Sequence, residues 1–146
     1  MTAVQQQKEL SLKNACVSFM FAYQQRSVEK MLSFCDPQGE VFFKPLGESG
    51  KGKIMELGKA LWTSLIDSFP NLDNTVDAAI AEDGETVRCQ VVISGTQAKD
   101  FAGIVSKGNH FESDHIFIFR LNPAGKIDKI EIEWDHEDFT RQLGAA

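Results

Sequence analysis

The chain has 146 residues, 42% of them hydrophobic and eleven of them phenylalanine, which is typical of one folded domain with a single sizeable core and excludes a disordered segment. Its formal net charge of -6, without a stripe of lysine and arginine, argues against nucleic acid as a partner. Three scattered cysteines without a CxxC spacing predict reduced thiols, and the N-terminal residues resemble neither a signal peptide nor a membrane span, so we expect a cytoplasmic protein with no membrane partner.

Helical periodicity dominates the first half of the chain. Apolar residues recur at helical spacing over residues 10–23, which predicts a long first helix. Ser27 is suited to cap a short second helix, which we expect to end at Pro37. A strand is predicted at "EVFFKPL", followed by a glycine-rich turn and a third helix that ends before Pro70. The third helix carries two apolar stripes, so we expect a sheet to wrap around it.

Strand patterns dominate from residue 75 onward. Four runs of strand-forming residues are separated by turn signals such as "DGE" and "NPAGK", and they read "TVDAAIAE", "TVRCQVVISGT", "HFESDHIFIFRL" and "IDKIEIEW". Short strands joined by such turns predict an antiparallel meander. Because helices come first and strands later, we predict an α+β fold with the helices packed on one face of a curved sheet, in a single domain that spans residues 1–146.

The last predicted strand has two different faces, because side chains alternate along a strand. One face is apolar, with Ile130, Ile132 and Trp134, and the other is charged, with Lys129, Glu131, Glu133 and Asp135. In one interpretation the charged face meets water. In the other, the end of the strand rolls over a cavity and an acid at the rim points inward.

Asp135 also has a structural interpretation. As the N-cap of a final helix it would place Asp138 at the third helical position, where a carboxylate can reach back toward the cap. Trp134 and Phe139 would then occupy the two positions of a hydrophobic staple. The pattern leaves open whether Asp135 caps a helix, acts in a pocket, or does both.

Over nearly its whole length the chain resembles the SnoaL-like polyketide or ester cyclases of the nuclear transport factor 2-like superfamily. The resemblance is carried by short motifs in a characteristic order: "FAYQQRSVEKML", "SFPNL", "AEDGETV", "SGT", "FAGI", "FRLNPAGKI", "WD" and "QLG". It implies a cone-shaped, curved antiparallel or mixed sheet wrapped around N-terminal helices and enclosing an apolar pocket. It also implies a homodimer and chemistry that uses no metal or organic cofactor.

The same resemblance implies an acid/base role for Asp135, which lies ten residues after Gly125 and seven before Gln142. The chain departs from the family pattern at Gln97, where histidine is frequent, and at Glu131, where tryptophan is common. Cyclisation in this family is an intramolecular aldol reaction, in which a base removes a proton next to a carbonyl group and the enolate attacks a second carbonyl.

Several side chains are candidates for the pocket around Asp135. Aromatic rings would disfavour its charge and raise its pKa, and the candidates are Phe19, Tyr23, Trp62, Phe117 and Trp134. Glu131 would add like-charge repulsion. His115, on the strand face of Phe117, is a candidate to polarise a carbonyl or relay a proton. Each of these residues also has an ordinary structural interpretation, in core packing or on a solvated face.

Two functions therefore follow from the sequence. The first is a cofactor-independent enzyme that cyclises, isomerises or dehydrates a small apolar carbonyl compound, with Asp135 as general acid/base. The second is a non-catalytic module of the same fold that binds a small molecule or dimerises. The histidines His110, His115 and His136 lack a third ligand at a recognisable spacing, so a metal site is not predicted.

Overall fold

The computed structural model describes residues 2–145. Helices α1 (Ala3–Gln24), α2 (Val28–Ser33) and α3 (Lys59–Ser68) precede most of the strands. The strands are β1 (Cys35–Phe43), β2 (Lys51–Lys53), β3 (Asp73–Ala81), β4 (Thr86–Thr96), β5 (His110–Leu121) and β6 (Ile127–Trp134), and α4 (His136–Gln142) follows the last of them. A 3₁₀ segment, η1 (Lys44–Gly50), and a π-helical turn, η2 (Ile54–Gly58), flank β2. The arrangement confirms the predicted α+β class.

Side-chain caps fix the beginnings of the first two helices. Thr2 and Gln5 form a reciprocal capping box, with Gln5 N donating to Thr2 Oγ1 at 3.1 Å, so α1 begins several residues earlier than its apolar periodicity predicts. Ser27 caps α2 as predicted, because its Oγ accepts from Lys30 N at 3.3 Å. No helix within residues 2–145 has both the length and the apolar character that a membrane crossing requires.

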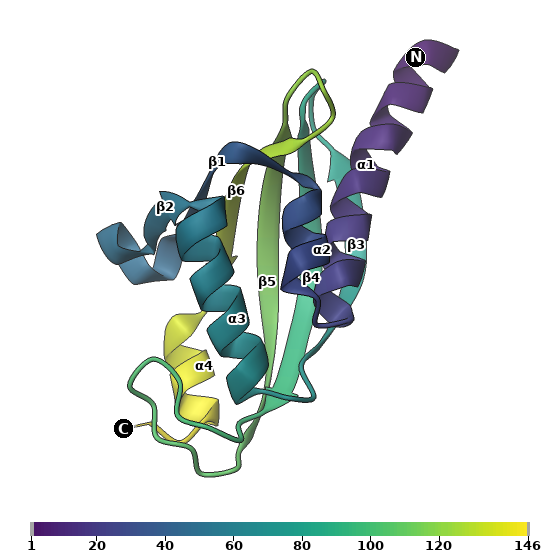
Figure 1. Ribbon diagram of the computed structural model, residues 1–146. Helices are drawn as coiled ribbons and strands as arrows, with labels where there is room; N and C mark the ends of the chain where they lie inside the picture. Colours follow the sequence, from purple (N-terminus) through teal and green to yellow (C-terminus); the bar gives the residue numbers. More distant parts are fainter. Residues whose placement is uncertain (1, 146) are drawn as a thin grey trace.

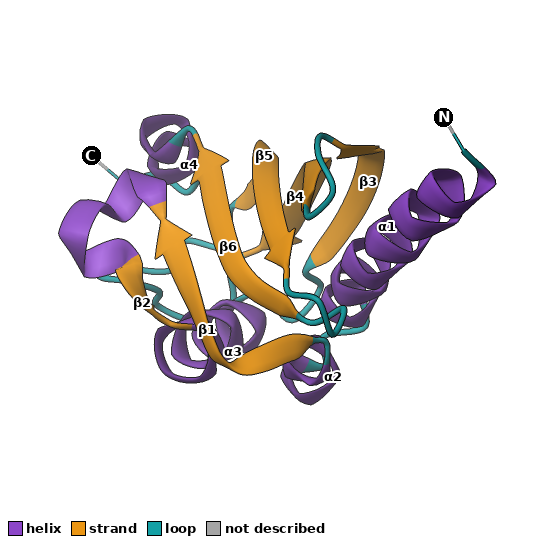
Figure 2. Cartoon of the chain, turned by 90° about the horizontal axis from the view of Figure 1, so that it is seen from above, coloured by secondary structure: helices purple, strands orange, loops and turns teal. Residues whose placement is uncertain are grey.

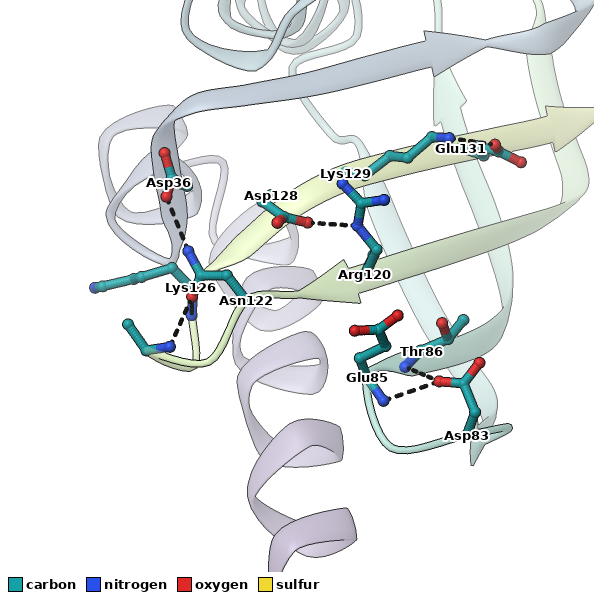
Figure 3. Close-up of polar contacts among 11 residues, drawn as sticks. Asp36, Asp83, Glu85, Thr86, Arg120, Asn122, Lys126, Asp128, Lys129 and Glu131 are labelled. Atoms are coloured by element: carbon teal, nitrogen blue, oxygen red, sulfur yellow. Dashed lines mark hydrogen bonds and ion pairs between the residues drawn. The ribbon is translucent and has the colours of Figure 1, made fainter.

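The predicted end of α2 at Pro37 was wrong, because β1 already begins at Cys35. The register of β1 against β6 shifts between Cys35 and Glu40, so Pro37 lies in a bulge where its missing N–H costs no ladder hydrogen bond. Asn122 Nδ2 donates to Asp36 Oδ2 at 2.8 Å and ties this bulge to the turn before β6 (Figure 3). A bulge held by a distant turn is a tertiary feature that local sequence does not specify.

The six strands form one mixed sheet in the order β2-β1-β6-β5-β4-β3. Strands β3 to β6 pair in antiparallel fashion as predicted, β2 pairs antiparallel with β1, and β1 runs parallel to β6. Bulges in β1, β3 and the β5–β6 pair increase the twist of the sheet. Figure 2 shows the sheet curving around α3, with α1 and α2 on the same side. The curved sheet around N-terminal helices confirms the predicted architecture.

The hydrophobic core fills the space between the helices and the inner face of the sheet. Strands β4 and β5 supply alternating inward residues, among them Cys89, Phe117 and Phe119, all of them buried. Trp62 of α3 is 2% exposed and packs edge-to-face against Phe19 of α1 with ring centroids 5.4 Å apart. The expected wrapping of the sheet around α3 is therefore present.

The three cysteines are core residues with free thiols. Burial raises the pKa of Cys35 to about 12 and that of Cys89 to about 11, and it also raises the pKa of Cys16. At neutral pH these thiols are therefore protonated and act as small hydrophobic side chains.

Candidate functional site

An apolar cavity of about 90 Å³ lies where α3 and α4 meet the inner face of the sheet. Leu61, Trp62 and Leu65 of α3 line it on one side, and Phe117 of β5 and Ile132 of β6 line it from the sheet. Pockets that hold drug-sized ligands enclose roughly 300–1,000 Å³, so this cavity suits a much smaller compound.

Two further segments line the cavity. Phe139 of α4 contributes one side chain, and Phe101 comes from the loop between β4 and β5. Their rings lie edge-to-face with centroids 6.5 Å apart. In Figure 1 this loop and α4 lie together at the end of the molecule where α3 ends. Residues distant in sequence therefore build one wall.

Five side chains in the lining carry a polar atom: Tyr23, Trp62, His115, Trp134 and His136. Tyr23, near the end of α1, is buried, and burial raises the pKa of its hydroxyl, so that it stays protonated at neutral pH. The remaining lining is made of aliphatic and phenylalanine side chains. A few polar groups in an apolar enclosure are the usual composition of a site for a small organic molecule.

His115 lies on the inner face of β5, as its alternation with Phe117 predicts. Its Nδ1 is 3.1 Å from the carbonyl oxygen of Ser113. A carbonyl oxygen only accepts, so Nδ1 carries the hydrogen and the lone pair of the neutral ring is on Nε2. Burial lowers the pKa of His115 to about 4, against the opposing effects of the Ser113 hydrogen bond and the Asp114 charge. The imidazole is therefore neutral at physiological pH.

His136 is the first residue of α4 and lines the same cavity. Its Nδ1 lies 3.2 Å from Nε1 of Trp134. Indole nitrogen only donates, so Nδ1 of His136 is the acceptor and the hydrogen of its neutral ring is on Nε2. Trp134 also stacks on His115, with ring centroids 5.5 Å apart and an interplanar angle of 17°. The indole thus contacts both imidazoles.

The structure confirms that Asp135 caps α4. Its Oδ1 accepts from Asp138 N at 3.0 Å, whereas the carboxylate of Asp138 binds Arg141 and Gln142 instead of reaching back. Asp135 is exposed and does not line the cavity. Strand alternation explains this placement, because position 135 shares the outer face with Glu133. The acid/base role of Asp135 stays a prediction, without the dry surroundings that we expected for it.

The other predicted site residues divide between the cavity and its surroundings. Tyr23, Trp62, Phe117, Trp134 and His115 line it, whereas Phe19 and Glu131 do not. Phe19 is fully buried one helical turn before Tyr23, where it packs between Trp62 and Phe119. Its position on the inner face of α1 is too deep in the core to reach the cavity.

Glu131 lies on the outer face of β6, opposite the cavity. Its carboxylate pairs with Lys44 Nζ at 3.3 Å and with Lys129 Nζ at 3.4 Å, and Figure 3 shows the second pair. Desolvation raises the pKa of Glu131, but the hydrogen bonds from the two lysines outweigh it and hold that pKa below its ordinary value. Glu131 is therefore a charged, paired surface residue.

His136 is the functional candidate that sequence reasoning missed, because it was considered only as a metal ligand. The alternation of side chains along β6 could have identified it. His136 lies two residues after Trp134, so it continues the set of residues 130, 132 and 134 that point to the inner face. Within residues 2–145 no group of three or more His, Cys, Asp or Glu side chains is arranged to hold a metal ion.

Comparison with protein-family models gives a match to the SnoaL-like polyketide cyclase model over residues 19–143. No curated protein sequence matches the chain significantly.

Solved structures match over almost the whole chain. A proposed SnoaL-like polyketide cyclase from Jannaschia sp. CCS1 is 16% identical with a TM-score of 0.82, covering 94% of each chain. TsrD from Streptomyces laurentii is 21% identical with a TM-score of 0.80, covering 94% of this chain and 97% of its own. IdmH, a proposed polyketide cyclase from Streptomyces antibioticus, is 19% identical with a TM-score of 0.76, covering 92% of this chain and 99% of its own. At these identities the likeness shows the fold alone.

Proposed function

Because the chain belongs to the SnoaL-like polyketide cyclase family, we propose that it catalyses a cyclase-type reaction of a small, largely apolar carbonyl compound bound in the cavity beside His115. The chemistry is proton transfer by the protein's own side chains, as in an intramolecular aldol reaction or a related isomerisation or dehydration. The observation that carries the proposal is a neutral imidazole that lines an apolar cavity and whose Nε2 has no hydrogen-bond partner among the described residues.

The proposed steps follow from this geometry. Nε2 of His115 accepts a proton from the carbon next to the substrate carbonyl, and the electrons of that C–H bond form the enolate. The enolate carbon attacks a second carbonyl, a C–C bond forms, and the new alkoxide takes the proton back from His115. No atom or electron is left over, so no cofactor is needed.

His115 supports this role better than Asp135 does. With its pKa lowered to about 4, His115 has a basicity close to that of a carboxylate, and it is unprotonated at neutral pH. A base of this strength is effective through placement, because the walls of the cavity restrict the positions that a bound substrate can take relative to the imidazole. Asp135 is exposed and its Oδ1 is engaged by the amide of Asp138.

The cavity size narrows the expected compound. At about 90 Å³ the cavity has room for a single small ring or a short branched chain, and it lies well below the roughly 300–1,000 Å³ of pockets that hold drug-sized ligands. A single-ring ketone such as cyclohexanone is therefore a suitable probe.

The test is enolisation of cyclohexanone in D₂O, followed by the loss of its α-proton NMR signal. We expect the wild-type protein to accelerate exchange and His115→Phe to lower the rate by about 10²-fold or more. His110→Phe is the matched control, because His110 is exposed and bonds Thr96 outside the cavity. Equal exchange by the wild type and His115→Phe would refute the role of His115.

Binding without chemistry is the second candidate function. It is favoured by the almost wholly apolar lining and by the capping role of Asp135, which leaves the cavity without a carboxylate. It predicts that cyclohexanone binds while its α-protons exchange no faster than in buffer.

A further inference from the structure

We propose that His136 is a second catalytic residue, which donates a hydrogen bond from Nε2 to the substrate carbonyl oxygen, and that Trp134 is the positioning residue for both imidazoles. This inference rests on the proposed function and assigns a role to a residue that the aldol scheme above does not use.

The two imidazoles are set in complementary tautomers. Nδ1 of His115 donates to the Ser113 carbonyl, so its Nε2 is an acceptor. Nδ1 of His136 accepts from the Trp134 indole, so its Nε2 is a donor. Neither Nε2 has a hydrogen-bond partner among the described residues. Both rings line the same cavity, which is therefore bordered by one imidazole with an acceptor Nε2 and one with a donor Nε2.

Trp134 holds this arrangement through two different parts of its ring. Trp134 of β6 is directly opposite His115 of β5 in the strand register, which brings the indole face onto the imidazole. The edge of the indole donates to His136, whose ring centroid is 5.9 Å away at an angle of 74°. Phe43 supports the indole from β1, with centroids 6.5 Å apart.

The His136 ring is also held from its own helix. It stacks on Phe139, three residues later in α4, with centroids 5.9 Å apart and an angle of 24°. Asp135 caps the same turn, so the helix start that carries His136 is fixed. This gives the exposed Asp135 an indirect part in the site.

The chemistry needs such a donor. When His115 removes the α-proton, negative charge develops on the carbonyl oxygen, and an apolar cavity stabilises that charge poorly. A preorganised N–H aimed at the oxygen stabilises it, and a neutral imidazole serves this purpose in known enzymes. A neutral imidazole at His136 also donates this hydrogen bond without placing a positive charge in the apolar cavity.

The first test uses the free protein and no substrate. Nitrogen NMR of the imidazole rings is expected to show the Nδ1–H form at His115 and the Nε2–H form at His136. In Trp134→Phe the preference of His136 for one tautomer should be lost, whereas His110→Phe should leave it unchanged. The opposite tautomer at His136 in the wild type would overturn the inference.

The second test uses cyclohexanone labelled with ¹³C at the carbonyl. We expect its carbonyl resonance to move downfield on binding, because a donated hydrogen bond deshields that carbon. His136→Phe, which keeps the ring volume, should bind the ketone without that shift and should lose about 10²-fold or more in α-proton exchange.

The outcomes separate the two proposals. An unchanged downfield shift in His136→Phe, together with lost exchange in His115→Phe, rejects the donor role and leaves the proposed function standing. A bound, downfield-shifted ketone without exchange in the wild type rejects the proposed function and keeps His136 as a ligand-binding donor. Failure of the wild type to bind the ketone rejects both.

Discussion

We expect the imidazole of His115 to make the stability of this protein depend on pH. Burial lowers its pKa to about 4 in the folded state, whereas an exposed histidine in the unfolded chain titrates near about 6.5. Between about pH 4 and about pH 6.5 the unfolded state binds more protons than the folded state. The free energy of unfolding therefore rises as the pH rises through this range, and above the range this contribution of His115 is complete. Acidification through the window should cost the native state up to about 3 kcal/mol.

The prediction is a flatter pH dependence in His115→Phe. Urea unfolding at about pH 4.5 and about pH 7.5 should show a smaller difference for the variant than for the wild type, since phenylalanine has no proton to gain. His110→Phe should retain the wild-type difference. An equal difference in His115→Phe and the wild type would contradict the assignment.

Asp135 gives a second prediction at the scale of one residue. Asp135→Ala should lower the free energy of unfolding by about 1 kcal/mol through loss of the cap, whereas Asp135→Asn should stay close to the wild type, because asparagine caps nearly as well. Both are measured by urea unfolding. We expect Asp135→Asn to keep its α-proton exchange activity, and abolished exchange in a stable Asp135→Asn protein would restore the acid/base role that the family resemblance implies.

At the scale of single residues, the sequence indicates which face of a helix a side chain shares with its neighbours, but not how deeply that side chain lies in the core. Phe19 and Tyr23 share the inner stripe of α1, yet only Tyr23 reaches the cavity, because the depth of a residue depends on where α1 crosses the sheet. The sequence pattern left open whether the charged face of β6 meets water or a pocket. It could not reveal Lys44, which comes from η1 and pairs with Glu131 on the outer face.

At the scale of elements, the loop between β4 and β5 depends on the buried side chain of Gln97. Its Nε2 donates to the carbonyl oxygens of Lys99 at 3.1 Å and Ile104 at 2.9 Å. These bonds hold a tight turn in which Ala102 has a φ of 49° and Phe101 and Ile104 pair with each other. This tight turn places Phe101 and Ala102 in the lining of the cavity.

Gln97→Leu should therefore loosen this loop. The substitution removes the side-chain donor from the carbonyl oxygens of Lys99 and Ile104, of which the second keeps its hydrogen bond from Phe101 N. The loss is expected to cost about 1–3 kcal/mol in the free energy of unfolding. Hydrogen exchange at the Phe101 and Ile104 amides should become faster, because the mutual hydrogen bonds of these residues rely on the turn. Unchanged protection of both amides would show that the turn is stable without Gln97.

The elements predicted well were those with strong local signals. The start of α2 at Ser27 follows from capping chemistry. The turns that join β3 to β4 and β5 to β6 follow from their turn residues. The predicted glycine-rich turn after β1 instead contains η1 and the short strand β2, since β2 exists only through its pairing with β1. Such pairing depends on chain segments that local patterns do not bring together.

At the scale of the whole molecule, the predicted homodimer remains to be tested. The outer face of the sheet carries the partly exposed apolar residues Val92, Ile116 and Ile118 on β4 and β5. If this face is covered by a second copy, Ile118→Lys should shift the mass measured by light scattering from dimer to monomer. Phe21→Ala, on the exposed side of α1, is the control and should keep the wild-type mass. A monomeric wild type would end the prediction.

Strand β6 is the last strand along the chain, yet it lies third in the sheet, between β1 and β5. A nascent polypeptide that ends before Ile127 would hold two separate fragments of sheet, β2-β1 and β5-β4-β3, with an unsatisfied edge on each. Joining the two fragments requires β1 to pair with β6, whose residues lie about ninety positions later in the sequence, and contacts of such long range slow folding. Residues through Trp134 must therefore be synthesised before the cavity can form, and until then both open edges need protection from intermolecular pairing.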